Sequence, residues 1–258
     1  MTQYNENVCN TSATTIGGDI ALPNGNIIGG AYNYVISNSK YKNSINKVTV
    51  HTHAISIYGQ TNLSKKLILQ GFFSLASGNV YTILPVQNQK VKTKFANASH
   101  SAKLIIAYKS QVDKVLITPL VGFKYARYNV TGHDVNFKTQ NLSISTINNQ
   151  KASGLIGFEI VKSVKINNTT QIIPELHMEA EKFLYNKQQK LRMQIMSSLF
   201  SNKKEILILV KPAKYSYKIG GVISLKHRYT EIAAMYEYLI SDNKYFSHKG
   251  VVKLKISF

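Results

Sequence analysis

The chain has 258 residues, of which 44% are hydrophobic, and a single cysteine, Cys9. This length allows one large all-β domain or two small domains, and one cysteine excludes an internal disulfide scaffold. The formal net charge of +20 would suit nucleic acid or an anionic surface. The basic residues are scattered, however, and a composition rich in Lys, Asn, Ile and Tyr fits an AT-rich coding sequence. We therefore expect no nucleic-acid partner.

Membrane-spanning helices are not expected, because no apolar run approaches the roughly 18 residues that one requires. One of the longest such runs is Ile206–Val210. The first residues, Met1–Asn7, contain neither the basic nor the apolar region of a signal peptide. An exported membrane protein with this sequence would have to be a fragment of a longer precursor; otherwise a membrane location would be the wrong interpretation.

Apolar and polar residues alternate with period 2 from about residue 14 to the end, which predicts strands rather than helices. The Asn24–Gly25 turn lies between two such runs and predicts a hairpin. About eleven strands are expected. They are Thr14–Leu22, Asn26–Ser37, Lys47–Gly59, Lys66–Val80, Ser101–Ser110, Lys114–Tyr128, Lys151–Lys162, Thr170–Tyr185, Val210–Lys226, Thr230–Ile240 and Val251–Phe258.

Strands of this length, roughly 9 to 15 residues, can cross a bilayer at a tilt near 45°. The expected connections alternate between short turns and longer segments. The longer ones are a polar stretch at Gln87–Asn97, a polar loop from about Val130, and an irregular insertion at Asn186–Lys204. Short turns on one side and long loops on the other are typical of outer-membrane barrels.

The last predicted strand has an apolar face that runs to the final residue. That face contains Val252, Leu254, Ile256 and Phe258, and the strand is preceded by Gly250. Termini of soluble proteins usually fray into water, whereas the last strand of an outer-membrane barrel faces lipid. We predict that these five residues serve barrel assembly and lipid contact.

Three carboxylates share one face of the strand predicted over Thr170–Tyr185: Glu175, Glu179 and Glu181. A catalytic carboxylate pair is one interpretation. The interpretation we favour is a cluster of lumen charges that pair with Lys and Arg from other strands, because inward charges in a narrow barrel need partners. No residue is predicted to be catalytic.

No cofactor or metal site is predicted either. His51 and His53 lie on one face of a strand, but spacing provides no third metal ligand. Cys9 has no evident catalytic partner. Pro119 and Pro174 fall inside predicted strands, where proline normally indicates an edge, a bulge or a rim position.

Several segments resemble a known family in order and spacing. They are Ser56–Gly59 followed by Asn62–Leu63, Ile117–Tyr125, Pro174–Leu176 and Lys244–Phe258. From about residue 14 to 258 the chain resembles the C-terminal β-domain of rickettsial autotransporters, the surface cell antigen family that includes outer membrane protein B.

This resemblance implies an all-β fold, an up-and-down antiparallel transmembrane β-barrel with 12 strands in the family and about 11 here. The linker helix and the first strand of the family are expected to be absent. That leaves 1–13 as a loop remnant and 14–258 as the barrel domain. Lys253 stands where the general barrel-assembly pattern prefers glycine, and the nearest glycine is Gly250.

The resemblance also implies a translocator of type V secretion in the outer membrane of a Gram-negative bacterium, which anchors or exports a passenger. Its expected partners are outer-membrane lipid, the barrel assembly machinery and a passenger encoded upstream. Two alternatives stay open: a passenger-less channel or structural barrel, and a soluble basic β-sandwich that binds an acidic partner.

Overall fold

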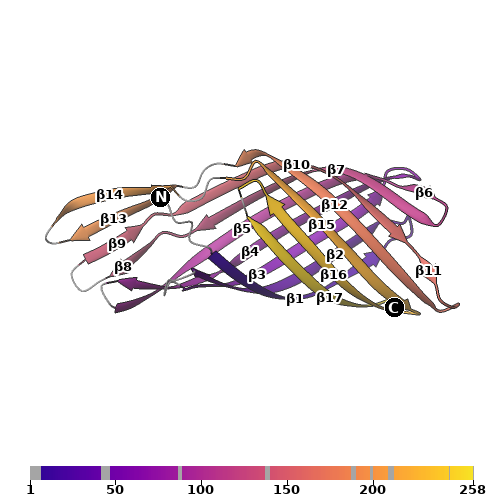
Figure 1. Ribbon diagram of the computed structural model, residues 1–258, viewed down its shortest axis with the longest axis horizontal. Coiled ribbons are helices and arrows are strands. Elements are labelled where there is room, and N and C mark those ends of the chain that lie inside the picture. Colours follow the sequence, from indigo (N-terminus) through magenta and orange to yellow (C-terminus); the bar gives the residue numbers. More distant parts are fainter. Residues whose placement is uncertain are drawn as a thin grey trace.

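The computed structural model describes residues 7–41, 47–86, 89–136, 140–186, 190–197, 200–208, 212–243 and 245–257, and their regular structure is strand. Among them, no helix is long and apolar enough to cross a membrane. Eleven strands form the wall (Figure 1). In order along the sheet they are β1 (Asn7–Ala21), β2 (Ile27–Tyr41), β3 (Lys47–Asn62), β4 (Leu67–Val86), β5 (Gln89–Tyr108), β7 (Val115–Val130), β10 (Ile147–Lys162), β12 (Thr170–Asn186), β15 (Tyr215–His227), β16 (Thr230–Ser241) and β17 (Phe246–Ile256).

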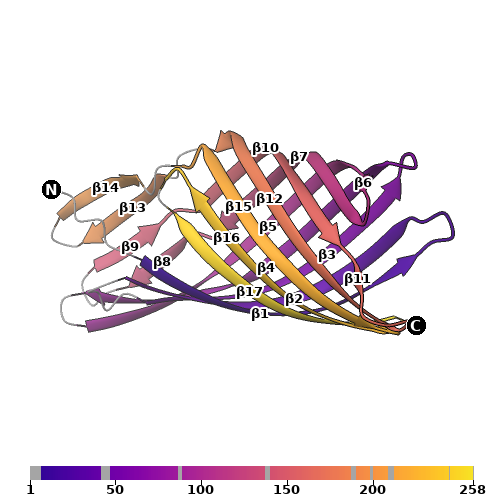
Figure 2. The ribbon, with the colours of Figure 1, turned by 45° about the vertical axis from the view of Figure 1, so that its right-hand side comes forward.

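The wall is a single sheet that curls until its two edge strands, β1 and β17, run side by side (Figure 2). Ten ladders join the eleven strands, and every one of them is antiparallel. Ten reversals of direction leave β1 and β17 pointing the same way. No ladder joins these two strands in the described ranges, and an antiparallel ladder between them is geometrically impossible.

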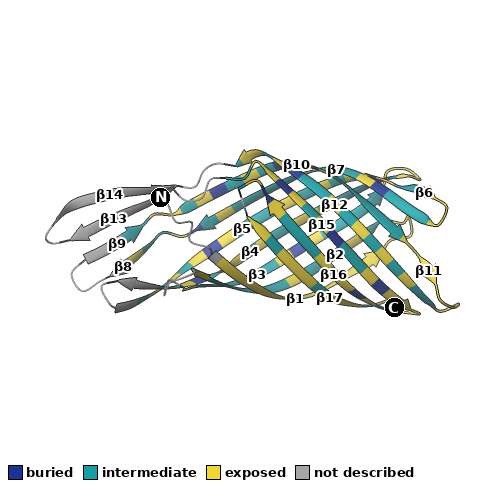
Figure 3. Ribbon diagram, viewed as in Figure 1, coloured by how far each residue is buried: buried dark blue, intermediate teal, exposed yellow. Residues whose placement is uncertain are grey.

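Side chains alternate between the two faces of this sheet, and the exposed ones include most of the large apolar residues that the structure describes. Figure 3 shows exposed residues distributed along the wall strands. Each wall strand contributes at least one large apolar side chain that is exposed on the outside. Examples, one per strand, are Ile16, Ile28, Ile55, Leu75, Leu104, Val121, Ile156, Leu176, Ile223, Ile232 and Leu254. A single sheet with its apolar face outward contradicts the β-sandwich alternative, which needs two packed layers with an apolar interior.

A second, four-stranded sheet projects from one end of the barrel, on the left in Figures 1 and 2. Its strands are β8 (His133–Asn136), β9 (Gln140–Ile144), β13 (Lys190–Ser197) and β14 (Phe200–Ile208). They come from the connections β7–β10 and β12–β15, where the sequence suggested a polar loop and an irregular insertion. That expectation was wrong, because strands beyond a barrel wall need no continuous apolar face.

The same reason explains the shifted strand boundaries. The polar stretch expected at Gln87–Asn97 is largely strand, since β5 pairs with β4 from Gln89 onward. β1 begins at Asn7, within the segment expected to be a loop remnant, whereas β15 begins only at Tyr215. β17 begins at Phe246, five residues before the predicted start at Val251, and Phe258 lies outside the described residues.

Both unexplained prolines lie where a ladder is interrupted. The ladder between β5 and β7 does not include Pro119, and pairing resumes beyond it with β6 (Ser110–Val112). The ladder between β10 and β12 likewise omits Pro174 and continues beyond it as β11 (Val164–Lys165). Because proline has no N–H to donate, each residue breaks pairing on one side only, and the wall continues past it.

Candidate pore and membrane-facing surface

The predicted carboxylate cluster lies on the inner face of β12. Glu175, Glu179 and Glu181 alternate with exposed Leu176 and Met178, so the acids point into the lumen and the apolar side chains point out. Glu181 is the most shielded of the three, with 8% of its side chain exposed. Charges that are shielded in this way need partners, and the lumen supplies them from several strands.

Glu179 is held by two lysines on different strands. Its Oε2 lies 2.9 Å from Lys103 Nζ on β5 and 3.6 Å from Lys218 Nζ on β15. β5 and β12 are separated by β7 and β10 in the sheet, so the Lys103 side chain reaches across two strands. Gly157 stands directly opposite Glu179 on β10, so that strand places no side chain beside the carboxylate.

Glu181 is satisfied by a lysine and two hydroxyl groups. Lys124 Nζ lies 3.5 Å from Oε1, and the buried Ser153 hydroxyl donates to the same oxygen. The Ser216 hydroxyl donates to Oε2 over 3.3 Å. Both carboxylate oxygens therefore have donors from neighbouring strands, as a shielded carboxylate requires.

Glu237 on β16 extends the network toward the end of the sheet. It lies 3.1 Å from His177 Nε2, 3.7 Å from Lys218 Nζ and 3.3 Å from Lys249 Nζ. His177 also places Nδ1 3.3 Å from Glu175. The sequence reasoning missed Glu237, although alternation with the outward Tyr236 and Tyr238 could have placed it on the inner face.

A separate pair connects the two edge strands. Lys255 Nζ on β17 lies 3.2 Å from Asp19 Oδ1 on β1, and the Tyr58 hydroxyl donates to Asp19 Oδ2 over 3.3 Å. The Tyr58 ring lies over Gly29, where an added Cβ would come within 2.4 Å of the ring. A lumen cavity of about 290 Å³ adjoins this pair. Its lining includes Asp19, Tyr58, Gln60, Gln70, Phe72 and Lys103.

Glu175, Glu179, Glu181 and Glu237 therefore each have a basic side chain within 4.0 Å. The network links β5, β7, β12, β15, β16 and β17 through side chains, and it leaves the interior polar and ionised. No group of three or more potential metal ligands is present in the described part of the chain. The ion pairs link strands of the wall to one another, as expected for paired lumen charges.

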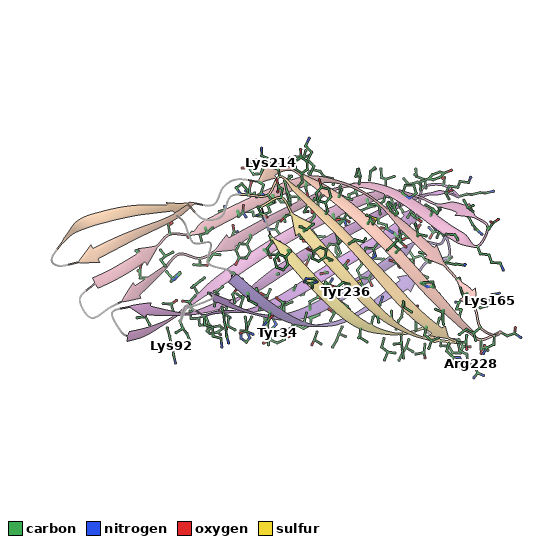
Figure 4. The ribbon with its side chains drawn as sticks, in the orientation of Figure 1. Tyr34, Lys92, Lys165, Lys214, Arg228 and Tyr236 are labelled. Carbon is green, nitrogen blue, oxygen red and sulfur yellow. The ribbon has the colours of Figure 1, made fainter. Side chains whose placement is uncertain are left out.

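His51 and His53 lie on the outer face of β3, each beside a tyrosine. The Tyr34 hydroxyl is 2.8 Å from His51 Nδ1, and the Tyr32 hydroxyl is 2.6 Å from His53 Nδ1. The edge strands β1 and β17 meet at a seam. On the β17 side of this seam, Tyr236 and Tyr238 on β16 pack against His248 on β17. Figure 4 labels Tyr34 and Tyr236. Aromatic residues with polar tips on a barrel exterior are typical of the girdles at a membrane interface.

The predicted C-terminal residues lie on the outer face of β17. Val252 is 81% exposed, Leu254 63% and Ile256 53%, and Gly250 stands opposite Tyr236. Phe258 is outside the described residues, so its position in the wall stays a prediction. The role of the five residues in assembly likewise stays a prediction.

A curled antiparallel wall with an apolar exterior, aromatic side chains and an ionised lumen defines the class of transmembrane β-barrels. Within that class, the autotransporter β-domain family matches residues 5–230. The chain belongs to this family, which confirms the expected fold class and the resemblance to autotransporters.

Two relatives from Rickettsia illustrate the relationship. The putative surface cell antigen sca1 of Rickettsia conorii is 31% identical over 94% of this chain. The putative surface cell antigen sca2 of Rickettsia felis is 30% identical over 96% of this chain. The chain spans only 13% and 16% of the lengths of these two relatives.

Two solved structures have the same fold at low identity. The translocator domain of the autotransporter NalP from Neisseria meningitidis aligns with a TM-score of 0.74 at 11% identity, covering 98% of this chain and 82% of that domain. The β-domain of the Bordetella autotransporter BrkA aligns with a TM-score of 0.72 at 12% identity, covering 97% and 92%. These likenesses concern the fold alone.

Proposed function

We propose that this chain is an outer-membrane translocator barrel that anchors a passenger or assists its passage to the cell surface. The observation that carries the proposal is that the wall is apolar outside and charged inside. All eleven wall strands present apolar side chains outward, while carboxylates and lysines pair in the lumen. Such a surface is stable only against hydrocarbon. The proposed location is the outer membrane of a Gram-negative bacterium, with outer-membrane lipid as the first partner.

The proposed role is mechanical rather than enzymatic. Ion pairs between strands far apart in the sheet, such as Lys103–Glu179, hold the lumen wall in shape while polar side chains keep it wet. A passenger in an extended or helical form would meet hydrogen-bonding groups there instead of apolar ones. The barrel assembly machinery is the proposed partner for insertion, through the outward face of β17.

We further propose that one more strand completes the wall between β1 and β17. These edges run in the same direction, so a strand antiparallel to both would pair with each. Unpaired edges in lipid leave rows of unsatisfied backbone groups, which is costly. A segment encoded upstream, together with the passenger, is the proposed source, since the surface cell antigens are several times longer than this chain.

A fusion experiment tests the function. A signal peptide and a short epitope are placed before residue 1, and the fusion is expressed in a Gram-negative host. We expect the product to need detergent for extraction from the outer membrane and the epitope to be accessible to antibody on intact cells. Release by salt or carbonate would overturn the membrane location.

The alternative of a passenger-less channel or structural barrel predicts a different result in the same experiment. The chain would again require detergent, but the epitope would stay inaccessible on intact cells and would be detected only after the outer membrane is opened. The hollow, charged lumen favours keeping this alternative as the second candidate.

A further inference from the structure

A basic cavity lies at the end of the barrel where the connecting turns are short. Its volume is about 560 Å³. Its lining comes from the turn between β11 and β12 and from the turn between β15 and β16, and it includes Lys165, Asn167, Thr169, Gln171, Lys226 and Arg228. Figure 4 labels Lys165 and Arg228 together at this end, opposite Lys92 and Lys214 at the other end.

Strand register brings the cations of this cavity together. Lys165 stands opposite Gln171, and Gln171 stands opposite Lys226 on the next strand. The backbone of Arg228 is held beside them, because its N–H donates to Thr169 O over 3.0 Å. Three positive side chains therefore line one cavity on adjacent segments.

These cations have no ionic partner within 4.0 Å in the portion of the chain that the structure describes. Glu231 is the cross-strand neighbour of Lys226, but it also stands opposite Lys255. Gln171 accepts a hydrogen bond from Ser163 at Oε1, which leaves its amide N–H groups as donors. The cavity thus offers donors and positive charge with no matching anion.

We propose that this cavity binds a phosphate group. The Arg228 guanidinium can hold two phosphate oxygens at once, and the two ammonium groups neutralise the charge. The Gln171 amide adds a neutral donor. A phosphodiester of a phospholipid headgroup and a free phosphate share this chemistry.

The register favours a soluble source. Lys226 stands opposite the inward Glu231, and Gln171 and Lys165 follow on the same face, so the cations line the lumen side of the wall. Val164 stands opposite Ile172 and points outward with the apolar surface. A phosphate dissolved in the lumen reaches these cations, whereas a lipid on the exterior meets the opposite face of the wall. The inference does not depend on passenger export, because binding by the barrel alone would establish it.

A pair of charge-matched variants tests the proposal. The cavity variant combines Lys165→Gln, Lys226→Gln and Arg228→Gln. The control combines Lys65→Gln, Lys109→Gln and Lys114→Gln, which removes the same charge at the same end of the barrel from residues outside the cavity lining. Both are refolded with the unmodified chain in neutral detergent, and the folded fraction is checked by heat-modifiable mobility.

Binding is measured by native mass spectrometry with phosphatidylglycerol, with phosphatidylcholine and with inorganic phosphate. We expect the unmodified chain and the control to bind inorganic phosphate equally, within about twofold, and the cavity variant to lose about tenfold or more in affinity. If phosphatidylglycerol shows this loss and inorganic phosphate does not bind, the site stands and its source is a lipid headgroup.

Two results would overturn the proposal. One is an equal affinity of the cavity variant and the control, whether both lose binding or both keep it, which would mean that the cavity does not hold the anion. The other is an absence of binding to both phosphatidylglycerol and phosphate by the correctly folded, unmodified chain. Neither result would bear on export of a passenger, which the epitope experiment measures separately.

Discussion

Lys255 and Asp19, which are 236 residues apart in the chain, form an ion pair of 3.2 Å across the seam of the barrel. Their strands run in the same direction, and in the described ranges no ladder joins them. Side chains therefore make a contact where a closed barrel would have backbone pairing. The lumen network continues this pattern of linking strands through ion pairs.

Reversing one charge at the seam should destabilise the barrel. Because the two side chains are 41% and 29% exposed, solvent screens the pair, and we expect a coupling of about 0.5–1 kcal/mol. Asp19→Lys should lower the free energy of unfolding in urea, and adding Lys255→Asp should recover part of the loss. If the double variant loses as much free energy of unfolding as the two single variants lose together, the two charges are not coupled and the seam contact contributes nothing.

Removing the charge of Glu179 should cost more. Glu179→Gln leaves Lys103 without a carboxylate partner and Lys218 with Glu237 alone in a shielded part of the lumen, and we expect a loss of about 2 kcal/mol in the free energy of unfolding. Glu231→Gln is the matched control, since Glu231 also faces inward but has no ion pair within 4.0 Å among the described residues. Equal effects of the two substitutions would contradict a specific role for the network.

Two glycines on adjacent strands should respond oppositely to the same substitution. A Cβ at Gly122 would lie 2.5 Å from Leu104 O and 3.1 Å from a Leu155 methyl group, so Gly122→Ala should destabilise the barrel by about 1–3 kcal/mol. A Cβ at Gly154 would meet no atom within 4 Å, so Gly154→Ala should stabilise its strand by about 0.5–1 kcal/mol. Unfolding in urea measures both, and a stabilising effect at Gly122 would refute the close packing.

The parts of the fold that face lipid could be predicted from sequence, because hydrocarbon imposes a strict period of two. Leu176 and Met178 point outward and Glu179 and Glu181 inward, as their alternation indicated. The strands of the projecting sheet, such as β13, lie beyond the wall and need no such pattern. Strand propensity alone is a weak predictor of strands there, so the sequence suggested an irregular insertion.

The sequence could not predict which side chains pair in the lumen, and the reason is a different one. The contact between Lys103 and Glu179 depends on the curl of the sheet, which brings β5 within reach of β12 across two intervening strands. Alternation places each of these residues on the inner face, but it cannot say which cation meets which acid. The ladder interruptions at Pro119 and Pro174 also required the observed register.

The outward face of β17 gives the sharpest test of insertion. Val252 is 81% exposed on the outside, whereas its neighbour Val251 points inward. Val252→Lys would place a charge against lipid, at a cost of about 2–4 kcal/mol near the bilayer midplane and less near an interface. We expect the heat-modifiable, folded form to fall sharply for Val252→Lys and to persist for Val251→Lys, whose new charge lies in the polar lumen. Phe258→Lys should also impair insertion. Unchanged folding of Val252→Lys in bilayers, measured beside Val251→Lys, would mean that this face does not contact lipid.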